Sequence, residues 1–172
     1  MTTGFIRKKQ SWKRFSVKAG SVLFLLALIA LFFTRFHFAF DSQDDRCLPD
    51  HFIYLIDKKN QTIERDGIYA FSTGSMKGVF NTDKNVVKVL KGMPGDDVEV
   101  DVLENVIING SVVAEGLALA EILSKPKALF IGKGKLHADE YWFMGETDTS
   151  YDSRYWGAVR NEQIIGRAYP VF

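Results

Sequence analysis

The chain begins with a polar, basic segment and then becomes continuously apolar. The stretch AGSVLFLLALIALFFT, residues 19–34, contains no charged residue. Because Lys18 and Arg35 can extend their charged ends outward, the apolar stretch reaches Phe40, which is long enough for one helix to cross a bilayer. The pattern predicts a basic tail over residues 1–18, a transmembrane anchor over 19–40 and a folded domain over 41–172.

A cleaved signal peptide would begin in the same way, with a basic region and an apolar core. The segment after the core, RFHFAFDSQ, is aromatic and has no small residues at the spacing that cleavage requires. We therefore expect the segment to stay in place as an anchor in the lipid bilayer.

Charge is distributed unevenly on the two sides of the apolar run. Six Lys and Arg residues precede the run, and no Asp or Glu occurs before Asp41. The positive-inside rule then places the amino end in the cytoplasm and residues 41–172 outside, which in a Gram-negative bacterium means an inner-membrane protein with a periplasmic domain. From Asp41 onward 21 acidic residues face 15 basic ones, and such a domain is a poor partner for nucleic acid.

Beyond the anchor the hydrophobic pattern is that of a mainly β protein. Short runs rich in β-branched and aromatic residues are bounded by Asp, Asn and Gly, and they predict strands at 52–56, 67–71, 85–90, 140–145 and 164–172. Asn109-Gly110 predicts a tight hairpin turn between residues 106–108 and 112–113. A short helix is expected around 119–123. We expect one compact, mostly antiparallel β domain.

Candidate metal ligands are few in this sequence. One cysteine, Cys47, and three histidines, His37, His51 and His137, have no spacing typical of a metal site, so neither a metal nor a cofactor is expected. A catalytic pair of Cys47 with His51 or His137 remains open at this stage.

Two longer motifs are more specific. In KVLKGMPGDDV, residues 88–98, Lys88 stands four residues before a G-x-P-G-D turn, and DTSYDSRYWGAVRNEQIIGRA, residues 148–168, contains an S-x-D-S-R-x-W-G block followed by an I-x-G-x-A strand. Together with the anchor, these motifs resemble those of the type I signal peptidases. The resemblance implies a single membrane helix followed by a signal-peptidase-like (LexA-like) antiparallel β catalytic domain.

The resemblance also implies roles for individual residues. The family uses a Ser/Lys dyad whose lysine is kept neutral by burial and acts as general base, and Lys88 matches that lysine. Ser150 would hydrogen-bond Lys88 and orient its amine, whereas Asp152 and Arg154 would pair and hold the wall of the site. Residues 145–148, G-E-T-D, are shorter than the family pattern and are not carried over as functional.

The expected nucleophile is Cys47, although a second candidate exists. Ser75 lies in a G-S-M segment like that of the general branch of the family, but it falls after the strand that should follow the nucleophile. The position expected for the nucleophile holds Cys47-Leu48-Pro49, which resembles the S-x-P segment of the conjugative-transfer (TraF-type) branch. Cysteine replaces serine there, and a thiol ionises more easily than a hydroxyl.

The oxyanion site departs from the family pattern. The Cys47 backbone N–H would bind the oxyanion, but the general branch adds a serine hydroxyl two residues before the nucleophile, and here that position is Asp45. A carboxylate would repel the oxyanion.

Three hypotheses for function follow. In the first, the chain is a signal peptidase with a Cys47/Lys88 dyad that processes a membrane-tethered preprotein, namely the prepilin of a conjugative type IV secretion system. In this case water or an amine resolves the acyl-enzyme, and the amine would cyclise the product. In the second, it is a general signal peptidase that uses Ser75. In the third, it is a non-enzymatic subunit that binds other subunits of the secretion assembly.

Overall fold

The computed structural model describes residues 11–41, 46–60, 62–74 and 84–172 and forms two compact units, residues 1–36 and 37–172. The first contains one helix, α1 (Trp12–Arg35), none of whose residues is buried. By length and composition α1 can cross a membrane, and it is the one such helix in the described part of the chain. A single amino-terminal span therefore fits the structure.

The limits of α1 differ from the anchor limits expected from hydropathy, 19–40. The helix begins seven residues earlier and ends at Arg35, and Phe36–Phe40 form strand β1 instead. Phe36 already has an extended backbone, and β1 lies at the edge of a sheet beside β2 (Ile53–Asp57). Hydropathy alone could not find this boundary because FHFAF is as apolar as the end of the helix.

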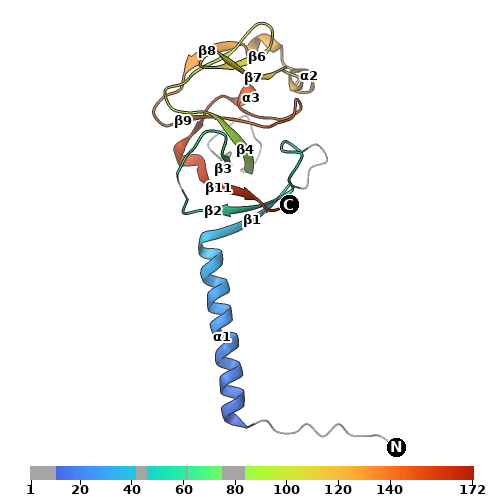
Figure 1. Cartoon of the computed structure of the whole chain (residues 1–172). Coiled ribbons are helices and arrows are strands. Elements are labelled where there is room, and N and C mark those ends of the chain that lie inside the picture. Colours follow the sequence, from blue (N-terminus) through green and yellow to red (C-terminus); the bar gives the residue numbers. More distant parts are fainter. Residues whose placement is uncertain (1–10, 42–45, 61, 75–83) are drawn as a thin grey trace, which may run out of the picture. The chain divides into compact units, whose positions relative to one another are not determined.

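The second unit is built on a seven-stranded sheet with the order β1-β2-β11-β3-β4-β9-β10 (Figure 1). The pairs from β2 to β10 along this order are antiparallel. The remaining strands are β3 (Ile68–Ser72), β4 (Asn85–Gly92), β9 (Glu140–Met144), β10 (Val159–Arg160) and β11 (Ile164–Pro170). The expected antiparallel β domain is confirmed, with predicted and observed strand ends a few residues apart.

A smaller sheet has the order β7-β6-β5-β8. Its strands are β5 (Asp97–Val100), β6 (Asn105–Ile108), β7 (Ser111–Glu115) and β8 (Gly132–Lys135). Asn109 and Gly110 both have positive φ, 50° and 81°, as a tight I′ turn between β6 and β7 requires. The hairpin expected at this dipeptide is confirmed.

In the described part of the domain there are four short helical segments: α2 (Leu119–Ile122), η1 (Lys127–Leu129), α3 (Ser153–Trp156) and η2 (Asn161–Gln163). The helix expected near residue 119 is therefore present as α2. Helix α3 was not predicted from the sequence, and it lies inside the motif at 148–168. Asp152 caps α3, because its carboxylate accepts a hydrogen bond from the Arg154 backbone N–H.

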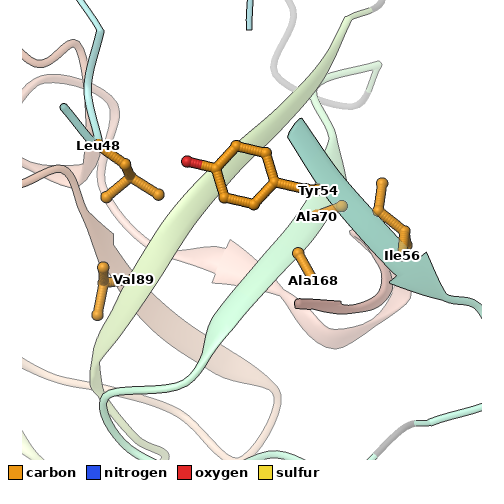
Figure 2. Close-up of a cluster of buried hydrophobic side chains, with 6 residues drawn as sticks. All are labelled: Leu48, Tyr54, Ile56, Ala70, Val89 and Ala168. Carbon is orange, nitrogen blue, oxygen red and sulfur yellow. The ribbon is translucent and has the colours of Figure 1, made fainter. Parts of the chain in front are cut away.

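One of the clusters of the core lies directly beside the expected nucleophile. It contains Leu48, Tyr54, Ile56, Ala70, Val89 and Ala168, contributed by β2, β3, β4, β11 and the segment before β2 (Figure 2). Leu48 is only 3% exposed. Burying a leucine side chain stabilises the fold by about 2 kcal/mol. This packing fixes the backbone next to Cys47.

Candidate active site

Strand β4 brings Lys88 into the interior of the domain. Lys88 lies opposite Tyr69 of β3 and is 3% exposed. On the other side, β9 pairs with β4 only from Val89 to Gly92. Among the described strands, none pairs with this side of β4 over residues 85–88, and Lys88 lies where the pairing with β9 ends.

The amine of Lys88 has a defined partner. Lys88 Nζ donates a hydrogen bond to Ser150 Oγ at 2.8 Å, and Ser150 is fully buried. Within the residues that the structure describes, Lys88 forms this hydrogen bond and no ion pair. The contact expected from the resemblance is thus present, while the catalytic role of each partner stays a prediction.

A buried ion pair holds the segment that carries Ser150. Asp152 and Arg154 contact each other through Oδ2 and Nη2 at 2.7 Å, with side chains 0% and 2% exposed. Asp152 also accepts from the Gly145 backbone N–H, and Arg154 donates to the carbonyls of Gly116, Thr147 and Ser150. Burial by itself would lower the pKa of Arg154, but its hydrogen bonds and proximity to the Asp152 carboxylate raise it. The ion pair therefore holds the backbone on both sides of Ser150 in place, through hydrogen bonds to Gly145, Thr147 and Ser150 itself.

Cys47 lies next to the same loop. Its thiol is free and half-buried, and its carbonyl accepts a hydrogen bond from the Glu146 backbone N–H at 2.8 Å. A Cβ added to Gly145 would lie 2.1 Å from Ser150 Oγ and 3.0 Å from the Cys47 carbonyl oxygen. Gly145 thus lets the two segments approach each other, a role that the sequence analysis missed.

Cys47 and Lys88 line one pocket of about 330 Å³. Its other lining residues are mostly apolar or aromatic, and they come from β1, β2, β4, α3 and the adjoining loops: Ala39, Phe40, Asp41, Leu48, Tyr54, Lys84, Val86, Val87, Tyr151 and Trp156. A free thiol and a buried amine on the wall of one concave, largely apolar site are groups that can support acyl transfer.

Two tyrosines that line this pocket, Tyr54 and Tyr151, have raised pKa values. Burial, followed by the carboxylates of Asp41 and Glu146, raises the pKa of Tyr54 to about 12. Burial also raises the pKa of Tyr151, whose ring packs edge-on against Trp156 with centroids 4.8 Å apart. Both phenols therefore stay protonated through the physiological range and can donate hydrogen bonds.

The other residues that the sequence suggested for the site do not line this pocket in the described part of the chain, or lie outside that part. Ser75 and Asp45 lie outside the described residues. No histidine is among the described residues that line the pocket, so the structure adds no support for a Cys/His pair. In the described ranges no group of three or more His, Cys, Asp or Glu residues could hold a metal ion. The site thus consists of Cys47, Lys88 and the loop around Ser150.

Comparison with known proteins finds relatives of one kind. The chain is 34% identical to "Probable signal peptidase I-2" of Synechocystis sp., over 63% of this chain and 48% of that protein. It is 31% identical to "Signal peptidase I" of Pseudomonas fluorescens, over 51% of this chain and 43% of that protein. The chain therefore spans about half the length of the curated relatives it matches.

A solved structure and a family model were also compared with this chain. The crystal structure of a signal peptidase I from Enterococcus faecalis matches 63% of this chain and 98% of that chain, at 23% identity and a TM-score of 0.41. The family model described as "Signal peptidase, peptidase S26" matches residues 12–172, which include α1 and both sheets. This chain belongs to the signal peptidase family, peptidase S26.

Proposed function

We propose that this chain is a membrane-anchored peptidase of the signal peptidase type, with Cys47 as nucleophile and Lys88 as general base. One observation carries the proposal. The buried amine of Lys88 is held at 2.8 Å by Ser150 Oγ in a pocket whose wall includes the Cys47 thiol. A general base must present its nitrogen to the proton that it takes, and the hydrogen bond to Ser150 fixes the position of the Lys88 amine.

In the first step, Lys88 takes the thiol proton while Cys47 Sγ attacks the carbonyl carbon of the scissile peptide. The new S–C bond forms, the π electrons of the carbonyl move to its oxygen, and the Cys47 backbone N–H donates to that oxyanion. When the intermediate collapses, the C–N bond breaks and the leaving amine takes the proton from Lys88. The product is an acyl-thioester on Cys47.

In the second step, Lys88 removes a proton from water, whose oxygen attacks the carbonyl carbon of the thioester. The C–S bond then breaks, the carboxylic acid is released, and the Cys47 thiolate takes the proton back from Lys88. An amine can take the place of water, in which case an amide forms instead. Ser150 orients the Lys88 amine in both steps. Asp152 and Arg154 do no bond chemistry in this scheme, because their charges are already paired with each other.

The proposed substrate is an extended segment of a membrane-tethered preprotein. The side of β4 over residues 85–88 that no described strand pairs with can form backbone hydrogen bonds with such a segment, as in strand addition. The apolar walls of the pocket favour small apolar side chains before the cut. The basic segment before α1 supports a cytoplasmic amino end, which would place the site on the outer side of the inner membrane.

We further propose that the substrate is the pilin of a conjugative type IV secretion system. The Cys47-Leu48-Pro49 segment supports this assignment by its resemblance to the S-x-P segment of the TraF-type branch. A thioester is more prone than an ester to attack by an amine, so a cyclised product fits the chemistry as well as a linear one. Other subunits of the secretion system are then expected partners.

The test is cleavage of a candidate prepilin co-expressed with the full chain, with the product mass read by mass spectrometry. Cys47→Ala and Lys88→Ala should both abolish processing. Lys91→Ala is the matched control, because Lys91 lies on the same strand but pairs with Asp66 at the surface. A product lighter than the linear peptide by one water would indicate cyclisation.

Each alternative has its own outcome. Full processing by Cys47→Ala, together with its loss in Ser75→Ala, would replace the proposed nucleophile by Ser75. Wild-type protein that processes neither prepilins nor secretory preproteins, and whose Cys47 is not acylated by a reactive peptide ester, would support a non-enzymatic subunit of the secretion assembly.

A further inference from the structure

Tyr54 is a buried polar side chain of the pocket that the mechanism above leaves unused. It is 1% exposed, belongs to β2, and lines the same pocket as Cys47 and Lys88. Figure 2 shows its hydroxyl pointing toward Leu48, the residue that follows Cys47. The polar end of the ring therefore faces the segment that carries the proposed nucleophile.

The hydroxyl of Tyr54 has only a weak partner within the described residues. It donates to the His51 carbonyl oxygen at 3.2 Å. Hydrogen bonds between two oxygens are usually about 2.7–2.8 Å long, so this one is extended and easily exchanged. A better acceptor that arrives in the pocket, above all a negatively charged oxygen, can replace the His51 carbonyl.

We infer that the Tyr54 hydroxyl is a second oxyanion donor, which leaves the His51 carbonyl and donates to the scissile carbonyl oxygen of the substrate when Cys47 attacks. The inference rests on the proposed function and adds a catalytic residue to it. The Tyr54 proton is shared with the oxyanion and not transferred, so the bond changes of the acylation step remain as described above.

The charges around the pocket favour such a donor. Burial raises the pKa of the Tyr54 phenol, and so do the nearby Asp41 and Glu146 carboxylates and Cys47. Arg46 has the opposite effect and lowers this pKa. The phenol therefore stays protonated wherever the peptidase would work. The Asp41 and Glu146 carboxylates also disfavour an oxyanion, so the backbone N–H of Cys47 alone would leave it poorly stabilised.

The experiment measures two reactions of Cys47 in the full chain in detergent micelles. The first is acylation by a tripeptide 4-nitrophenyl ester ending in alanine, which passes through an oxyanion. The second is alkylation by iodoacetamide, which does not. Tyr54→Phe should slow acylation by roughly 10-fold to 1,000-fold with little change in KM, and should leave alkylation within about twofold.

The matched control is Tyr69→Phe on β3. This hydroxyl donates to the Thr62 carbonyl and accepts from the Glu64 backbone N–H, and Tyr69 does not line the pocket. Both reactions should stay close to wild type in this variant, which shows what loss of a structural hydroxyl does.

Two results would overturn the inference. In one, Tyr54→Phe acylates at the wild-type rate; in the other, acylation and alkylation fall together, which would mean that the hydroxyl only holds the Cys47 segment. Failure of the proposed function is a different result, because wild type would then not acylate at Cys47 while the thiol still reacts with iodoacetamide. The inference would fall with it.

Discussion

Removing the Asp152 carboxylate should destabilise the domain more than any surface substitution. Asp152 is fully buried and contacts Arg154, itself 4% exposed, at 2.7 Å. In Asp152→Ala the guanidinium remains buried without its counter-charge, and the backbone N–H groups of Gly145 and Arg154 lose their acceptor. Breaking a buried pair from one side costs about 3–5 kcal/mol.

This cost is a large share of the stability of the domain. Domains are stable by about 5–15 kcal/mol, and a unit of the length of residues 37–172 has an unfolding entropy of about 0.3 kcal/mol per kelvin. The expected fall in Tm is therefore about 10–17 °C. Thermal unfolding of the full chain in micelles, followed by near-ultraviolet circular dichroism, measures it.

Lys133→Met is the control for this prediction, because the Lys133–Glu99 pair lies at the surface, with side chains 67% and 34% exposed. Its Tm should equal that of the wild type. A fall of less than about 3 °C in Asp152→Ala would refute the reasoning, since the loop around Ser150 would then not depend on the buried pair.

Three further predictions concern the site and the turn after β4. Gly145→Ala should lower kcat in the cleavage assay by about 100-fold, because the new Cβ would displace Ser150 or Cys47. The control is Gly134→Ala, whose new Cβ meets nothing within 4 Å and whose kcat should equal that of the wild type. Ser150→Ala should lower kcat by about 10-fold or more with little change in KM, because the Lys88 amine loses its orienting partner; equal kcat values would contradict this. Burial alone would raise the pKa of Asp96, but hydrogen bonds from one backbone N–H and two side chains hold it below its usual 3.8. The Asp96 carboxylate therefore stabilises the folded state above pH 3.8, and this contribution is lost as the pH falls through its lower pKa in the folded protein. When Tm is measured at decreasing acidic pH, it should therefore fall more steeply for the wild type than for Asp96→Asn.

The sequence was sufficient to predict those elements that depend only on residues close together in the chain. The uncharged run predicts a helix that can span a membrane, because hydropathy and length decide that property. Asn109-Gly110 predicts its hairpin because the turn itself requires two residues with positive φ. The motif around Lys88 singled out the lysine that the structure buries beside Ser150.

The tertiary structure decided the features that depend on distant partners. Phe36–Phe40 is apolar enough to continue α1, yet it forms β1 because β2 offers an edge for pairing. Gly145 matters because the Cys47 segment, nearly a hundred residues away in the chain, lies against it. From the sequence alone Tyr54 is an ordinary strand residue, and only the packing of β2 against the core turns its hydroxyl toward Leu48, which lines the same pocket. Such contacts arise from strand order and register, and these depend on the whole chain and not on the residues nearby.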